Sequence, residues 1–435
     1  MSCDKTLFPR ITIHNLGPIA DCELNIKDFT VLTGRQASGK STIAKAVYFC
    51  ETIKNDILSQ FMMPKNEDSH SIQPMTGIAK RLRSKFLKVF GSTWAMPSDM
   101  SIVYDYKENI YVRISLKKDD SDSSKNFVNI EFCPEILGYI RSNSSENWQD
   151  LNVAEFKAEL DALFGSPYEC VYVPAGRGMI TLLTDQLNYI FTGVDEIANV
   201  AVDYCTRSYV ERILKIRPVL NNGLEGLLND KLHYSQDKID RVATKQMLEF
   251  CKNVLKGHYH YISGEERLQI ADDKYVKINY ASSGQQETVW IFNLMFYYLL
   301  NRRKILFILE EPEAHLYPDA QQTTAKALGL FVNSGNKALI TTHSPYILGE
   351  FNNLLYASKI PAEDKRREKI IKSNCILDPK TSSAFYLDEG RCEQAMDSEY
   401  GLILSELIDG ASTAINEEHD NLMELIWENE EKRNG

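Results

Sequence analysis

A glycine-rich octapeptide near the N-terminus constrains the fold of this 435-residue chain more than any other feature. It follows the spacing G-x-x-x-x-G-K-[ST] and reads Gly34-Arg35-Gln36-Ala37-Ser38-Gly39-Lys40-Ser41. The apolar residues 29–32 before it predict a buried strand, and the apolar positions after Ser41 predict a helix. Glycines let backbone N–H groups wrap around phosphate, and a helix N-terminus adds positive potential. The sequence therefore predicts a phosphate-binding loop.

The same loop, a P-loop, supplies the residues that we expect to bind a nucleotide and its metal. Lys40 would reach the β- and γ-phosphates, and the hydroxyl of Ser41 would bind Mg²⁺. The expected phosphate-binding residues are Gly34, Arg35, Gln36, Ala37, Ser38, Gly39, Lys40, Ser41 and Thr42. The alternative is a glycine turn before an ordinary helix, and the strand and helix predicted on either side weigh against it.

A second motif is an apolar strand that ends in two carboxylates. Residues 305–309 are all apolar, and Glu310 and Glu311 follow before Pro312. In a P-loop NTPase such a strand runs beside the P-loop strand, which brings its last carboxylate to Mg²⁺ or its water. We assign Glu310 to the metal and Glu311 to the general base. Alone, the motif is more typical of a solvated strand end; the P-loop elsewhere in the chain favours the catalytic interpretation.

Two further short motifs follow the P-loop along the chain. Ser283 and Gly284 open an apolar helix predicted over residues 285–301, and His343 follows a strand predicted at residues 338–341. Alone, the first would be an ordinary helix cap and the second a histidine with a local hydrogen bond. Their order and spacing after the P-loop make them candidates for the same site.

Taken together, these motifs resemble the ABC-type ATPase heads, within the RecF-like and OLD-like branch that is often described as AAA ATPases. The resemblance implies an ATPase that uses ATP and Mg²⁺, with Glu311, His343 and Lys40 as catalytic residues. The matching segments are residues 11–19, the P-loop, and residues 282–287, 309–318 and 342–345.

The resemblance also implies a homodimer, or a higher homo-oligomer of such dimers, in which two copies enclose two ATP molecules. Ser283 and Gly284 of one copy would contact the γ-phosphate that Lys40 of the other copy holds. His343 would sense the same phosphate within its own copy. The nucleotide site is therefore expected to be complete only between two copies.

The sequence departs from the family pattern in two places. Glu310 stands where Asp is usual, which lengthens the reach to the metal. The glutamine of the family's Q-loop has no clear counterpart, and Arg177 and Gln186 both stay open for that position.

OLD nucleases continue into a Toprim domain with a Glu and an Asp-x-Asp pair, and the 92 residues after His343 contain no such pair. We therefore expect no nuclease in this chain and a separately encoded effector nuclease as its partner.

The pattern of elements predicts an α/β fold, a P-loop NTPase of the ABC-ATPase head type with an antiparallel β lobe and a helical insertion. Alternating residues near 102–106, 110–116 and 127–132 predict the β lobe, and further strands are expected at residues 354–357 and 370–377. The expected units are an N-terminal ATPase lobe (1–182), a helical insertion (183–257), a C-terminal ATPase lobe (258–391) and a helical tail (392–435).

Charge and composition limit the expected partners and location. The chain has 49 Lys and Arg against 60 Asp and Glu, a net charge of −11, so nucleic-acid binding needs a local basic patch. Residues 80–88 and 365–369 are the candidates. The longest apolar stretch, residues 289–300, is too short to span a membrane. Nine cysteines without a Cys-x-x-Cys pair fit a cytoplasmic protein with neither a disulfide framework nor a zinc site.

We expect ATP-driven closure of the assembly to act as a switch. The chain resembles the stand-alone ATPases of the bacterial anti-phage systems PARIS (AriA) and Septu (PtuA), which work with a separate effector nuclease. The alternatives are a RecF- or SMC-like DNA-repair ATPase that acts as a DNA clamp, a nucleotide-held scaffold and, least favoured, a transporter subunit. The acidic helix predicted at residues 417–431 is expected to pack on its own domain, with docking of a partner as the alternative.

Overall fold

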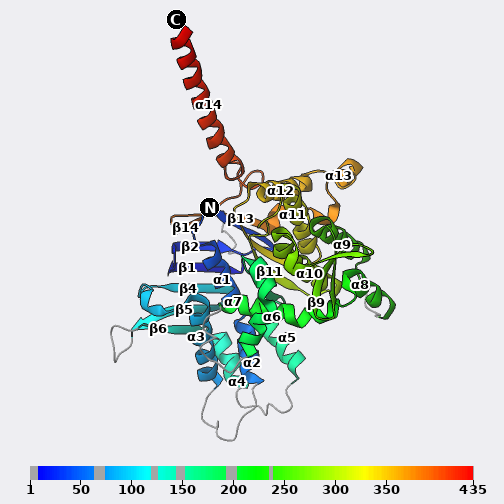
Figure 1. Ribbon diagram of the computed structural model, residues 1–435. Helices are drawn as coiled ribbons and strands as arrows, with labels where there is room; N and C mark the ends of the chain where they lie inside the picture. The colour runs from blue at the N-terminus through cyan, green and yellow to red at the C-terminus, as the bar shows by residue number, and fades with distance from the viewer. Residues whose placement is uncertain are drawn as a thin grey trace.

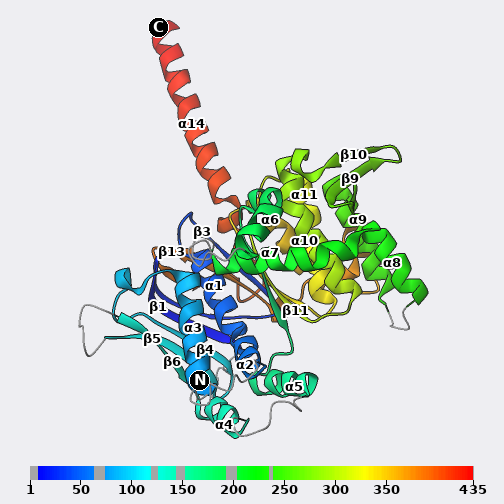
Figure 2. The same ribbon diagram turned by 60° about the horizontal axis from the view of Figure 1, so that its bottom comes forward.

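The computed structural model describes residues 8–62, 74–118, 126–143, 152–192, 203–234 and 239–434. Figure 1 shows a body built around a large sheet, from which one long C-terminal helix extends. Figure 2 shows the same body from a second direction, with helices gathered around the sheet. Among the helices of the described ranges, none is long and apolar enough to cross a membrane.

One mixed sheet of eleven strands organises the body. Its strands are β1 (Arg10–Leu16), β2 (Ile19–Asn25), β3 (Phe29–Gly34), β4 (Ser101–Lys107), β5 (Ile110–Lys118), β6 (Asn126–Phe132), β7 (Glu169–Val173), β11 (Ile305–Glu310), β12 (Lys337–Thr342), β13 (Ser382–Asp388) and β14 (Arg391–Gln394). Their order across the sheet is β6-β5-β4-β1-β2-β14-β13-β3-β12-β11-β7. Strands β13, β3, β12, β11 and β7 run parallel, whereas β6, β5, β4, β1 and β2 form an antiparallel meander. This architecture confirms the predicted α/β fold with an antiparallel β lobe.

Burial explains why the two halves of the sheet read differently in the sequence. All six residues of β11 are buried, as expected for a parallel strand covered on both faces. Along β4, buried and half-buried residues alternate, as in a strand with one face in the core. A continuous apolar pattern therefore indicates a strand buried on both faces, and an alternating pattern indicates a strand with one buried face.

Helices cover both faces of the parallel strands. The α-helices of the described ranges are α1 (Lys40–Glu51), α2 (Ile53–Phe61), α3 (Pro74–Phe90), α4 (Pro134–Ser142), α5 (Val153–Phe164), α6 (Arg177–Thr192), α7 (Tyr204–Ile216), α8 (Gly223–Tyr234), α9 (Arg241–Leu255), α10 (Ser283–Leu300), α11 (Pro318–Asn333), α12 (Pro345–Tyr356), α13 (Lys365–Ile370) and α14 (Glu406–Asn434). A second sheet, in the order β10-β9-β8, consists of β8 (His258–Ile262), β9 (Glu265–Ala271) and β10 (Lys274–Lys277). The predicted division into four units stays a prediction.

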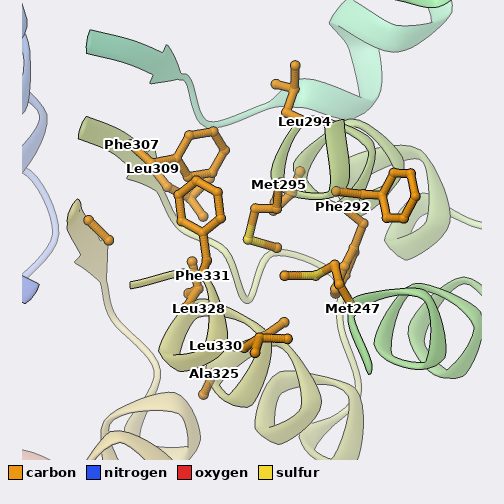
Figure 3. Close-up of a cluster of buried hydrophobic side chains, with 14 of the residues drawn as sticks. Met247, Phe292, Leu294, Met295, Phe307, Leu309, Ala325, Leu328, Leu330 and Phe331 are labelled. Atoms are coloured by element: carbon orange, nitrogen blue, oxygen red, sulfur yellow. The ribbon is translucent and has the colours of Figure 1, made fainter. Parts of the chain in front are cut away.

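Two hydrophobic cores lie on opposite faces of the parallel strands. On β11, Phe307 and Leu309 belong to the core that α10 and α11 cover, whereas Ile308 belongs to the core that α1 covers. Figure 3 shows the first of these cores, with Met295 of α10 and Phe331 of α11 beside the strand. The rings of Phe307 and Phe331 have centroids 5.5 Å apart. This packing fixes α10 and α11 on the strand that carries the candidate carboxylates.

Two strands that the sequence predicted do not form. Residues 354–357 end α12 and begin a 3-10 turn, and residues 370–377 contain a 3-10 turn at Ser373–Cys375. Phe351, Leu354 and Leu355 are all buried, and their helical spacing places them on one face of α12. The short apolar run was therefore the end of an amphipathic helix.

The structure also joins two cysteines that the sequence did not predict as a pair. Cys22 of β2 and Cys392 of β14 form a disulfide, with their Cα atoms 5.1 Å apart. The two residues are 370 positions apart in sequence and meet because β14 pairs with β2. The bond lies where the antiparallel half of the sheet meets the parallel half. The six other cysteines of the described ranges are buried and free.

Candidate active site

The P-loop connects β3 to α1, as the sequence predicted. Its backbone passes through the left-handed region at Gly34, Ala37 and Gly39. A Cβ atom added at Gly34 would lie 2.1 Å from the carbonyl oxygen of Leu387, and one at Gly39 would lie 2.2 Å from the side chain of Ile19. Both positions therefore require glycine. Gly39 caps α1 without a side-chain hydrogen bond, so the first N–H groups of the helix stay available to an anion.

Lys40 lies folded against the loop that precedes it. Its Nζ atom donates to the carbonyl oxygens of Gly34 (3.0 Å) and Arg35 (2.7 Å) and contacts the Ser38 hydroxyl at 3.3 Å. Burial lowers the pKa of Lys40 to about 8, an effect that the negative charges of Glu311 and Glu313 partly oppose. A phosphate group in the loop would supply the negative partner that this buried ammonium lacks.

Glu310 ends β11 as a buried carboxylate with one unsatisfied oxygen. Its Oε2 atom accepts a hydrogen bond of 3.0 Å from the backbone N–H of Ala175, whereas Oε1 is buried without a hydrogen-bond partner among the described residues. The hydroxyl of Tyr172 is also buried without a hydrogen-bond partner among the described residues. Burial, and then the negative charge of Glu310, raises the pKa of Tyr172. A buried carboxylate oxygen without a donor suits a hard cation, so Glu310 fits the predicted Mg²⁺ ligand.

Glu311 and His343 come together at the same edge of the sheet. Glu311 Oε1 lies 3.7 Å from His343 Nε2, and both side chains are partly exposed. The backbone of Glu311 is in the left-handed region, with φ of 43°. Glu313, which sequence reasoning missed, accepts hydrogen bonds from the His343 backbone N–H (2.9 Å) and the Thr342 hydroxyl (2.7 Å). Glu313 therefore fixes the turn that presents His343.

The expected position of the carboxylate strand was wrong in one respect. β11 does not run beside the P-loop strand β3, because β12 lies between them and pairs with both. The three strands are parallel, so their carboxyl ends still meet at one edge of the sheet. The inserted strand is the one that leads to His343. As a result, the histidine turn lies between the P-loop and the two glutamates.

Arg177 holds the ends of two strands together from a fully buried position. Its guanidinium donates to the backbone carbonyl oxygens of Pro174, Glu310 and Glu311, the last at 2.8 Å. Its Nε atom also donates to the carbonyl oxygen of Glu287 (3.0 Å) and lies 3.5 Å from the Glu287 carboxylate. Arg177 thus connects the carboxylate strand to α10. Gln186, the other residue left open for the Q-loop, is exposed farther along α6.

We expect Arg177→Met to be strongly destabilising, because it removes the hydrogen bonds to three strand-end carbonyls and leaves Glu287 as an uncompensated buried charge. The free energy of unfolding should fall by about 3–5 kcal/mol. Denaturant unfolding followed by circular dichroism measures this. Glu287→Gln, which keeps the shape and the bond to the Arg177 backbone N–H, is the matched control and should cost less. The double variant Arg177→Met with Glu287→Met should regain part of the loss; equal costs for single and double variants would contradict the pairing.

Ser283 and Gly284 lie at the start of α10, away from the P-loop contacts. Ser282 and Gln285 form a capping box, and Ser283 is exposed. A Cβ atom at Gly284 would lie 2.7 Å from the carbonyl oxygen of His315, so the turn packs against that loop. Across the described ranges, no hydrogen bond or ion pair joins Ser283 or Gly284 to the P-loop. Within one chain, the P-loop, the two carboxylates and His343 therefore lie together, whereas the turn at Ser283 and Gly284 makes no contact of these kinds with the P-loop.

Residues 9–166 and 191–348 match the protein family described as the AAA ATPase domain. No curated protein matches the chain. Similar solved structures include an Smc head bound to the C-winged helix domain of ScpA (10% identity, 89% of this chain and 96% of that chain, TM-score 0.40) and the SMC head domain from Thermotoga maritima (11%, 89% and 97%, 0.36). Because the family match covers well over half of its residues, the chain belongs to the AAA ATPase domain family.

Proposed function

We propose that the protein hydrolyses ATP with Mg²⁺ in sites formed between two copies, and that ATP-driven closure of the two copies acts as a switch. One observation carries the proposal. The P-loop, Glu310, Glu311 and His343 meet at one edge of the sheet, whereas Ser283 is exposed on another part of the same chain. A second copy would supply that exposed turn to the γ-phosphate.

Each residue has a role that follows from its place. The P-loop N–H groups and Lys40 bind and orient the phosphates. Mg²⁺ held by Ser41 and Glu310 would neutralise the charge that develops on the phosphates. Glu311 accepts the proton of the attacking water, and His343, fixed through Glu313, lies beside Glu311 to hold that water or the γ-phosphate.

Exposed aromatic residues next to the proposed contact segments support a composite site. Tyr280 is 82% exposed just before the Ser283 turn, Tyr317 is 78% exposed just after the His315 loop, and Tyr346 is 57% exposed just after His343. Large aromatic side chains are enriched at protein interfaces, and they stay in water in a single copy. A second copy that covers these segments would bury them.

We expect Ser283→Arg to abolish hydrolysis without weakening ATP binding, because the new side chain blocks the face that the second copy must approach. Ser84→Arg, at an exposed position on α3, is the matched control. Phosphate release and binding of a fluorescent ATP analogue measure the two properties. Hydrolysis by Ser283→Arg at the wild-type rate would contradict a site shared between copies.

The basic segments that the DNA-clamp alternative needs are partly engaged within the chain. On α3, Lys85 is buried and paired with Asp56 at 2.6 Å. Around α13, Arg366 pairs with Asp364 at 2.6 Å, and Arg367 donates to the carbonyl oxygen of Ile360. These contacts engage part of the positive charge that a clamp would need. Duplex binding that falls steeply between 50 and 200 mM salt would support the clamp instead.

Within the switch proposal, we assign the chain to bacterial anti-phage defence, as an ATPase that controls a separately encoded effector nuclease. The resemblance to the PARIS and Septu ATPases supports this role. Its test is a phage challenge of cells that carry the gene with its native neighbours. Protection that is present with the wild-type gene and absent with Lys40→Ala is the expected result. Equal plaque counts with and without the wild-type genes would contradict the role.

A further inference from the structure

Helix α14 extends from the body as an arm, which differs from the packing that the sequence favoured. Leu407 and Ile408 pack against the core at its start, and Asn352 of α12 exchanges two hydrogen bonds with the backbone of Ile403 just before it. Beyond these first turns, no other described element lies along α14 in either view (Figures 1 and 2). At about 1.5 Å per residue, its 29 residues reach about 40 Å.

The arm carries an apolar stripe that is open to water. Ile415, Leu422 and Ile426 are 66%, 54% and 50% exposed. Their spacings of seven and four residues place them on one face of the helix. An aligned set of large apolar side chains on a projecting helix marks a surface that another molecule covers.

The charge of α14 indicates what kind of molecule would cover the apolar stripe. The helix contains nine acidic residues and two basic ones, and no Lys or Arg lies between Glu406 and Ile426. Glu418 lies one turn from both Ile415 and Leu422, beside the stripe. A second α14 would bring carboxylates together without a counter-charge, and an anionic membrane surface would repel the helix. A protein surface with apolar residues edged by Lys or Arg would both cover the stripe and pair with Glu418.

We propose that α14 is a docking helix for a partner protein that presents an apolar groove or helix flanked by basic residues. This inference goes beyond the ATP switch and does not depend on it. The place of α14 links the two, because the arm is anchored on α12, which begins two residues after His343. A partner docked on α14 would therefore be held by an arm whose base contacts the helix that follows the candidate phosphate sensor.

The test uses two labelled peptides and the full chain. The basic probe has the α14 sequence with all nine acidic residues replaced by lysine, so it keeps the apolar stripe and reverses the charge. The second probe is the unaltered α14 sequence, which stands for a second copy. Binding is followed by fluorescence anisotropy without nucleotide, for wild type, for Leu422→Gln with Ile426→Gln, which removes the stripe without changing the charge, for Glu418→Gln and for Lys40→Ala. A fluorescent ATP analogue reports separately whether each variant keeps its nucleotide site.

The proposal predicts that the basic peptide binds wild type and Lys40→Ala equally. Its affinity should fall about tenfold or more in the Leu422→Gln, Ile426→Gln variant and several-fold in Glu418→Gln, while these two variants bind the ATP analogue as wild type does. Equal binding of the basic peptide to wild type and to the double variant would overturn the proposal, because charge alone would then attract the peptide and the apolar stripe would play no part. Preference for the unaltered peptide would overturn it in favour of a second copy, and no binding of either peptide would also overturn it. Failure of the ATP switch would appear instead in the nucleotide assays alone.

Discussion

Glu311→Gln is expected to lose ATP hydrolysis while it keeps ATP binding. The substitution preserves the shape of the side chain and removes the carboxylate that would accept the proton of the attacking water. Loss of a general base slows a reaction by about 100-fold or more. The substitution leaves Lys40, Ser41 and Glu310, the residues proposed to hold the nucleotide and Mg²⁺, in place, so affinity for ATP should stay near the wild-type value. A phosphate-release assay and a nucleotide-binding titration measure the two properties.

The control for this variant is Glu363→Gln, at an exposed position outside the site. It should hydrolyse ATP as wild type does. Hydrolysis by Glu311→Gln at the wild-type rate would show that another group is the base. Glu313 would then be the next residue to replace, because it lies in the same turn and one of its oxygens is buried without a hydrogen-bond partner among the described residues.

Lys40→Ala is expected to bind ATP more weakly and, as a result, to lose hydrolysis at ATP concentrations that saturate wild type. The variant removes a buried ammonium group that has only neutral oxygens as hydrogen-bond partners in the loop. Charge-assisted hydrogen bonds to phosphate contribute about 1.5–3 kcal/mol, so affinity should fall by about 10- to 100-fold. Isothermal titration calorimetry with ATP and Mg²⁺ measures the loss.

A matched lysine lies on α3, where Lys88 is exposed. Lys88→Ala should bind ATP as tightly as wild type does. If Lys40→Ala also binds ATP with unchanged affinity, the nucleotide does not occupy the P-loop, and the assignment of the site fails. Glu311→Gln therefore tests the hydrolysis step, and Lys40→Ala tests whether ATP binds in the P-loop.

Local motifs were predictable from the sequence because short-range physics determines them. The backbone of the P-loop takes positive φ values at Gly34 and Gly39, which glycine allows, and the helix that follows begins where the motif places it. The apolar helix predicted over residues 285–301 is local as well, and it forms as α10, which begins at Ser283. The alternating pattern of the β lobe and the apolar run 305–309 of β11 each predict the burial of their own strand.

Long-range features were not predictable in the same way. The position of β12 between β3 and β11 depends on how crossover connections order parallel strands, which no single segment encodes. The role of Arg177 depends on carbonyls that come from distant segments, and the pairing of Cys22 with Cys392 depends on the meeting of β2 and β14. The projection of α14 was missed because an apolar stripe has the same pattern whether its own domain or another molecule covers it.

The central claim is that ATP joins two copies through a shared site, and the mass of Glu311→Gln in solution tests it most directly. Mass photometry compares this variant with and without ATP and Mg²⁺, beside Lys40→Ala and Ser283→Arg. The account predicts that ATP stabilises even-numbered assemblies of Glu311→Gln and that neither of the other variants responds. An unchanged mass for Glu311→Gln, under conditions in which it binds ATP, would contradict a site shared between copies.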